Sequence, residues 1–203
     1  MKKILCLLAL LAGMVGQSFA ANVLVVGVTN VSLSDTTTAT NAIGDALSAD
    51  GHTVTKLALT GATSGQIASA LAGTPYDQLF FLDASATALL ASADVAAVAS
   101  FWNAHKGLVV DGRSYGYIFQ PTQAAELTLI KNVASAFTHT GGGLWIGTDD
   151  SPTWANNGNA ILGAIGVAPV TGNYSLPVNV TNPSSVLLQG VDPEDLWAAA
   201  GTV

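Results

Sequence analysis

The chain has 203 residues, of which 50% are hydrophobic and 9% are charged. This composition excludes an intrinsically disordered protein, because disordered chains combine low hydrophobicity with high charge. The chain has thirteen acidic and six basic residues, which gives a formal net charge of −7. Phosphate backbones and anionic lipids repel a negatively charged surface. Neither nucleic acid nor an anionic membrane is therefore an expected partner.

The first twenty residues have the pattern of a secretory signal peptide. A basic start precedes a mostly apolar core, Ile4–Gly16, and the small residues Ser18 and Ala20 form a cleavage site. We therefore predict cleavage after Ala20 and secretion from a bacterial cell to the periplasm, cell surface or medium. The first twenty residues are not expected to be a membrane anchor, because their apolar core is shorter than the roughly 20 residues that a spanning helix needs. No membrane span is expected in the chain after cleavage. The leader also contains Cys6, the only cysteine, so the mature chain is predicted to lack disulfides and thiol chemistry.

Strands and helices are predicted to alternate from the start of the mature chain to Gly166. Continuous or alternating apolar runs predict strands at 22–28, 52–59, 79–83, 108–111 and 144–147. Apolar stripes at helical spacing, with polar or proline starts and glycine stops, predict helices that begin at Asp35 or a nearby threonine, at Ser64, at Ser92 to Asp94, at Pro121 to Thr122 and at Ser151 to Pro152. The helix that begins at Pro121 to Thr122 is expected to be the longest.

This alternation predicts a flavodoxin-like, three-layer, doubly wound α/β fold with a mostly parallel sheet. After Gly166 the rhythm changes to short β-prone pieces separated by proline and glycine, which predicts a short β-rich C-terminal extension. We find no internal repeat and no second domain, so residues 21–203 are expected to form a single α/β domain. Whether the native chain continues past Val203 stays open.

Polar residues follow several of these strands, and the carboxyl ends of parallel strands open onto one crevice. The segment GLVVDGRSYG, residues 107–116, is central to this prediction, because it is a buried strand that leads into a glycine-flanked turn. We expect the ligand-binding residues at this crevice to be Asn30, Asp83, Asp111, Arg113, Ser114, Tyr115, Asp149, Asp150 and Trp154.

The four aspartates of that set permit two interpretations. They could bind Ca²⁺ or Mg²⁺ through their oxygens, or accept hydrogen bonds from sugar hydroxyls. Alternatively they cap the helices that follow, and Arg113 pairs with one of them; we favour this second interpretation. Trp154 is expected at the crevice rim, whereas Trp102 and Trp145 lie on periodic elements and are expected in the core.

Residues 112–116 also match the G-x-S-x-G elbow of serine hydrolases, with Ser114 in the place of the nucleophile. Two features argue against a catalytic triad. The next helix is expected to begin several residues after Ser114, and none of the three histidines follows a strand at its crevice end. His52 starts a predicted strand, His139 precedes one, and His105 lies near a helix end. We therefore predict that Ser114 is not an activated nucleophile.

Five short segments carry a family resemblance: VLVVGV near the mature start, Asp50–Val54, Tyr76–Leu79, Lys106–Gly116 and Asn182–Val191. In this arrangement the chain resembles the class I glutamine amidotransferase-like superfamily, especially its trehalose-utilisation-like and uncharacterised secreted branches. Catalytic members have a cysteine nucleophile where this chain has Ser114, and the protease-like branch has a histidine where this chain has Tyr115. The resemblance thus implies the fold and its crevice, but neither amidotransfer nor cysteine-based hydrolysis.

The leading hypothesis is a secreted, non-catalytic or catalytically degenerate binding domain for a small polar or carbohydrate ligand, with no cofactor. One alternative is a hydrolase that uses Ser114. The other is a structural module of a longer surface protein. The sequence determines neither the oligomeric state nor whether a metal is bound.

Overall fold

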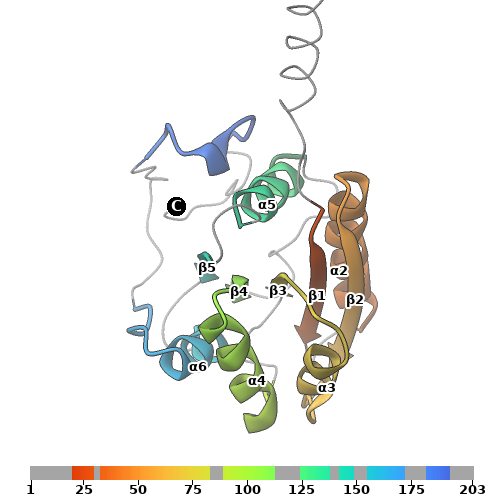
Figure 1. The fold of residues 1–203 in the computed structure, drawn as a ribbon, viewed down its shortest axis with the longest axis vertical. Helices are drawn as coiled ribbons and strands as arrows, with labels where there is room; N and C mark the ends of the chain where they lie inside the picture. Colours follow the sequence, from red (N-terminus) through yellow and green to blue (C-terminus); the bar gives the residue numbers. More distant parts are fainter. Residues whose placement is uncertain are drawn as a thin grey trace, which may run out of the picture.

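The structure is a computed structural model that describes residues 20–29, 33–82, 89–112, 124–137, 142–148, 155–171 and 182–192. Its strands are β1 (Asn22–Thr29), β2 (Thr53–Thr60), β3 (Gln78–Leu82), β4 (Gly107–Gly112) and β5 (Leu144–Thr148). Its helices are α2 (Leu33–Ala49), α3 (Gln66–Gly73), α4 (Ser92–Asn103), α5 (Ala124–Phe137), α6 (Asn156–Ala164) and the 3-10 helix η1 (Val186–Leu188), labelled where there is room in Figure 1. The predicted signal peptide lies outside the described residues, apart from Ala20.

The strands form one sheet in the order β2-β1-β3-β4-β5, and all four neighbouring pairs are parallel. Helices α2 and α5 cover one face, and α3, α4 and α6 cover the other. In Figure 1, α5 lies above β3, β4 and β5, and α4 and α6 lie below them. The predicted flavodoxin-like, three-layer α/β fold is therefore confirmed.

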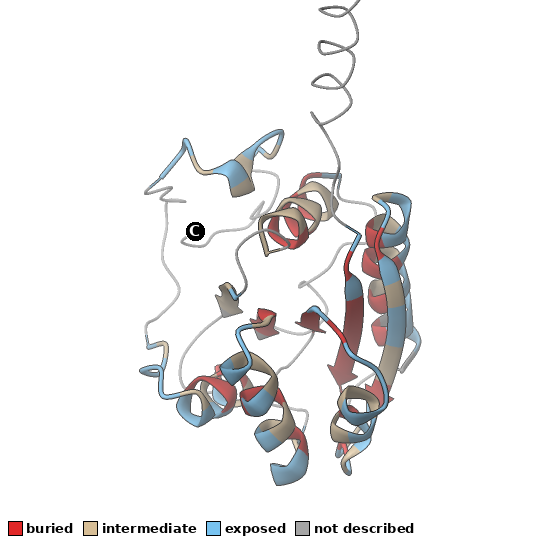
Figure 2. Cartoon of the chain, in the orientation of Figure 1, coloured by how far each residue is buried: buried red, intermediate tan, exposed pale blue. Residues whose placement is uncertain are grey.

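The core has two layers because the central strands are apolar on both faces, as parallel sheets covered by helices require. Every residue of β3 is buried, and every residue of β1 after Asn22. Between α2, α5 and the sheet lie Val25, Phe80, Val109 and their neighbours. Figure 2 shows the contrast with the edge strand β2, which mixes buried, intermediate and exposed residues.

Two of the sequence predictions about helices differ from the described elements. The longest described helix is α2, with 17 residues, whereas α5 has 14, and the predicted start of that helix at Pro121 to Thr122 lies outside the described residues. Asp35, which was expected at the start of a helix, lies within α2, because this helix already begins at Leu33. A threonine-rich start is compatible with a helix here because hydroxyls can bond back to the preceding turn; the Oγ1 atom of Thr38 donates to the carbonyl oxygen of Ser34 at 2.9 Å.

The glycines that precede β5 have a packing role. A Cβ atom on Gly142 would lie 3.1 Å from the carbonyl carbon of His105, and one on Gly143 would collide with the ring of Phe137. The same ring lies over Gly107, where a Cβ atom would come within 2.8 Å of Cδ2. Glycine therefore permits the end of α5 to pack against the starts of β4 and β5.

Two asparagine side chains, one on α6 and one on α5, hold the segments that follow α6 against these helices. Asn159 pairs with the backbone of Val170, donating to its carbonyl at 3.0 Å and accepting from its N–H at 2.8 Å. Asn132 of α5 donates to the carbonyls of Leu187 at 3.0 Å and Gln189 at 2.9 Å, and so holds η1 on α5. Much of the predicted β-rich extension, 172–181, lies outside the described residues.

Candidate functional site

The carboxyl ends of β3, β4 and β5 lie at one edge of the sheet, because these strands are neighbours and parallel. We call this the carboxyl edge; it ends with Leu82, Gly112 and Thr148. Of the predicted site residues, the structure places Asp111 there. The others lie outside the described residues, namely Asn30, Asp83, Arg113, Ser114, Tyr115, Asp149, Asp150 and Trp154.

The Asp111 carboxylate is fully buried near the end of β4, with 0% of the residue exposed. Asp111 follows Val109 by two residues, and side chains two residues apart on a strand point to the same face. Both side chains are therefore on the face that α2 and α5 cover. Asp111 pairs with Gly147 of β5. A Cβ atom on Gly147 would lie 3.0 Å from Oδ1 of Asp111 and 2.9 Å from Cη2 of Trp145, so glycine lets a carboxylate and an indole ring lie against the β5 backbone.

A second buried carboxylate, Glu126, belongs to the first turn of α5 and is only 4% exposed. It shares a helix face with the buried residues Ile130 and Val133, which pack against the sheet on the side of Asp111. Sequence reasoning missed Glu126. The available signal was an acidic residue at an inward position of an apolar helical stripe.

Buried hydroxyls occupy the same face further along the sheet. Thr29 at the end of β1 is 2% exposed, and Thr36 and Thr40 of α2 are each 1% exposed. Gly27 makes room for the last two, because a Cβ atom there would lie 2.6 Å from Cγ2 of Thr36 and would collide with Oγ1 of Thr40. The Thr40 hydroxyl is buried without a hydrogen-bond partner among the described residues.

The chemistry of this face is that of hydrogen-bond acceptors and hydroxyls. No group of three or more histidines, cysteines, aspartates or glutamates that could hold a metal occurs within the described ranges. Asp111 and Glu126 are two buried carboxylates on one side of the sheet. Ionised carboxylates are hydrogen-bond acceptors.

The histidines are relevant to the hydrolase alternative. His52 directly precedes β2 and His105 lies just before β4, so both are at the amino edge of the sheet. Ser114 follows the opposite end of β4 in the sequence, and a strand of six residues spans roughly 20 Å. The two described histidines therefore lie at the edge of the sheet opposite the end of β4 that leads toward Ser114; Ser114 and His139 lie outside the described residues.

The two tryptophans expected in the core are partly buried there. Trp102 packs against the cluster on the α3, α4 and α6 side of the sheet, and Trp145 packs against the cluster on the other side. Trp145 also lies beside the carboxylate of Asp111, since both approach Gly147. It thus contributes an aromatic ring to the candidate site as well as to the core.

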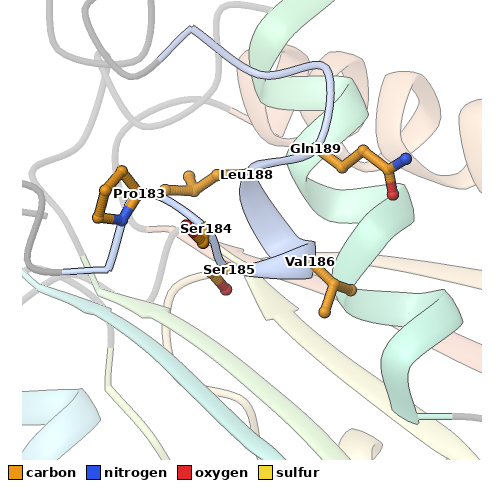
Figure 3. Close-up of a pocket in the computed structure, with 6 residues that line it drawn as sticks. All are labelled: Pro183, Ser184, Ser185, Val186, Leu188 and Gln189. Carbon is orange, nitrogen blue, oxygen red and sulfur yellow. The ribbon is translucent and has the colours of Figure 1, made fainter.

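A shallow pocket opens elsewhere, over the 182–192 segment. It is lined by Pro183, Ser184, Ser185, Val186, Leu188 and Gln189 (Figure 3). No charged side chain lines it, and Val186 is 64% exposed. This pocket offers neither the carboxylates nor the ring found beside β4 and β5.

Comparisons with family models, curated proteins and solved structures found no match to this chain. In addition, no helix in the described ranges has the length and apolar character needed to cross a membrane. The case for the candidate site therefore depends on the chain's own residues.

Proposed function

We propose that this protein is a non-catalytic binding domain for a small, hydroxyl-rich ligand such as a carbohydrate, taken up at the carboxyl edge of the sheet. The observation that supports this most directly is the buried Asp111 carboxylate beside the Trp145 ring. Carboxylates accept strong hydrogen bonds from hydroxyls, and an aromatic ring beside one provides an apolar surface for a sugar ring.

We further propose that the chain is a secreted, catalytically degenerate relative of the class I glutamine amidotransferase-like superfamily. The parallel sheet, with β4 leading toward Ser114, supports this proposal. Ser114 and Tyr115 replace the cysteine and histidine of catalytic members, which favours binding over catalysis. The leader-like pattern of the first twenty residues supports export.

The experiment is a thermal-shift and calorimetric screen of the exported protein with monosaccharides, disaccharides and polyols. We expect at least one of them to bind, and Asp111→Asn to weaken that binding about tenfold, since a hydrogen bond to a charged group contributes about 1.5–3 kcal/mol. Asp45→Asn is the matched control, because Asp45 is exposed on α2 and pairs with Lys56. If Asp111→Asn binds the ligand as tightly as Asp45→Asn does, the proposed site is wrong. If no compound in the screen binds, the proposed class of hydroxyl-rich ligands is wrong.

A fluorophosphonate probe tests the absence of catalysis separately. We expect no labelling of Ser114, because the two described histidines lie at the far edge of the sheet and an activated serine needs a base within about 2.6–3.2 Å. Stoichiometric labelling that is lost in Ser114→Ala would overturn the non-catalytic assignment and favour a hydrolase.

A further inference from the structure

The amino edge of the sheet contains a buried polar arrangement around Ala21, separate from the candidate ligand site. Ala21 is 4% exposed, whereas Ala20 before it is exposed. The backbone nitrogen of Ala21 donates to Nδ1 of His52 at 3.2 Å, and its carbonyl accepts from the N–H of Thr53 at 2.9 Å. Ala21 is thus fixed on both sides at the point where the chain enters β1.

The His52 side chain is placed as a hydrogen-bond acceptor. Because Nδ1 accepts from Ala21, a neutral ring carries its proton on Nε2. His52 is 6% exposed, and Nε2 is buried with no hydrogen-bond partner among the described residues. Burial lowers the pKa of His52 below its ordinary value of 6.5, and the nearby Asp50 carboxylate raises it by less. The ring therefore stays neutral, and able to accept, at neutral pH.

Charged side chains from four segments surround this edge. Asp50 follows α2, and the Nζ atom of Lys131 on α5 lies 3.6 Å from its carboxylate. Asp77 precedes β3 and accepts from the N–H of Asn22 at 2.9 Å, and the Nζ atom of Lys106, before β4, lies 3.7 Å from it. The two carboxylates and two ammonium groups balance in charge, and one carboxylate contacts the residue next to Ala21.

The predicted cleavage after Ala20 would act at this position. Hydrolysis adds the hydroxyl of water to the carbonyl carbon of Ala20 and a proton to the nitrogen of Ala21, which becomes an α-amino group. We propose that His52 is the binding site of this new α-amino group, with Nδ1 accepting a hydrogen bond from it. The other protons face the space that Ala20 vacates. The nearest carboxylates are Asp50, which acts on the His52 ring, and Asp77, which binds the N–H of Asn22. The new N-terminus is then bound at the sheet edge instead of fraying.

The test uses the full chain, exported by a bacterial host that can process it. Intact mass must first show a chain that begins at Ala21. The α-amino group is then modified by reductive methylation at neutral pH and its rate followed by peptide mapping. We expect the native protein to react about tenfold more slowly at Ala21 than the same protein unfolded in urea, because a hydrogen bond of ordinary strength must first open.

Two variants separate binding from general packing. His52→Asn keeps an acceptor oxygen close to the position of Nδ1, so slow modification is expected to persist. His52→Leu removes the acceptor and is expected to react as fast as the unfolded chain, with circular dichroism verifying its fold. If His52→Leu fails to fold, His52→Asn decides, because a folded His52→Asn protein that reacts as fast as the unfolded chain would overturn the proposal. A native rate equal to the unfolded rate, or a processed chain that does not begin at Ala21, would overturn the proposal.

Discussion

Asp94 links two helices on the same side of the sheet, and its replacement should weaken both. It lies in the first turn of α4, where the sequence pattern predicted a start to that helix. Its carboxylate instead accepts from the backbone N–H groups of Gly65 at 2.9 Å and Ala68 at 2.7 Å, at the start of α3. Asp94 is 1% exposed, so it caps a neighbouring helix in a water-excluded position.

The two hydrogen bonds determine the size of the effect. Each joins a neutral N–H to a carboxylate, and such bonds contribute about 1.5–3 kcal/mol, while loss of a helix cap costs about 0.5–2 kcal/mol. We expect Asp94→Ala to lower the free energy of unfolding by about 3 kcal/mol, with partial relaxation of α3 keeping the loss below the sum of both bonds. Asp94→Asn keeps one acceptor oxygen and should lose about half as much.

Equilibrium unfolding in urea measures these changes. The matched control is Ser92→Ala, since Ser92 is an exposed residue in the first turn of the same helix, and its effect should stay within about 0.5 kcal/mol. An Asp94→Ala protein with the stability of the control would refute the conclusion that this carboxylate holds α3 to α4.

Three further predictions follow from other contacts. Gly147→Ala should destabilise the protein by about 1–3 kcal/mol in urea unfolding, because the added Cβ atom would overpack the strand; Gly163→Ala, which meets nothing within 4 Å, should not. The free energy of unfolding should fall as pH drops below 6.5, because burial lowers the pKa of His52 in the folded state and the unfolded state then binds more protons. This part of the decline should be absent in His52→Asn. A His52→Asn protein with the same pH profile as wild type would contradict the role of His52. Asn132→Ala should expose the 182–192 segment to limited proteolysis, because its side chain donates to two carbonyls there; resistance equal to wild type would contradict that role.

Much of the fold could be predicted from periodicity alone. The apolar runs at β1 and β4 and the helical stripe of Ile43 and Leu47 on α2 depend on local spacing, and the structure buries them as expected. The prediction that Asp83, Asp111 and Asp149 share one edge had a sound premise, since β3, β4 and β5 are parallel neighbours. Two of those three aspartates lie outside the described residues, so their approach to one another stays a prediction.

The sequence by itself determined the alternation of strands and helices, because hydrophobic spacing is a local property of the chain. The partners of individual polar groups were decided only by the tertiary structure. Asp94 was expected to serve its own helix and instead caps α3, and His52 accepts a hydrogen bond from a residue 31 positions away. The burial of Glu126 depends on how α5 packs on the sheet. Burial makes an unpaired polar group costly, and which groups are buried together depends on how the layers pack.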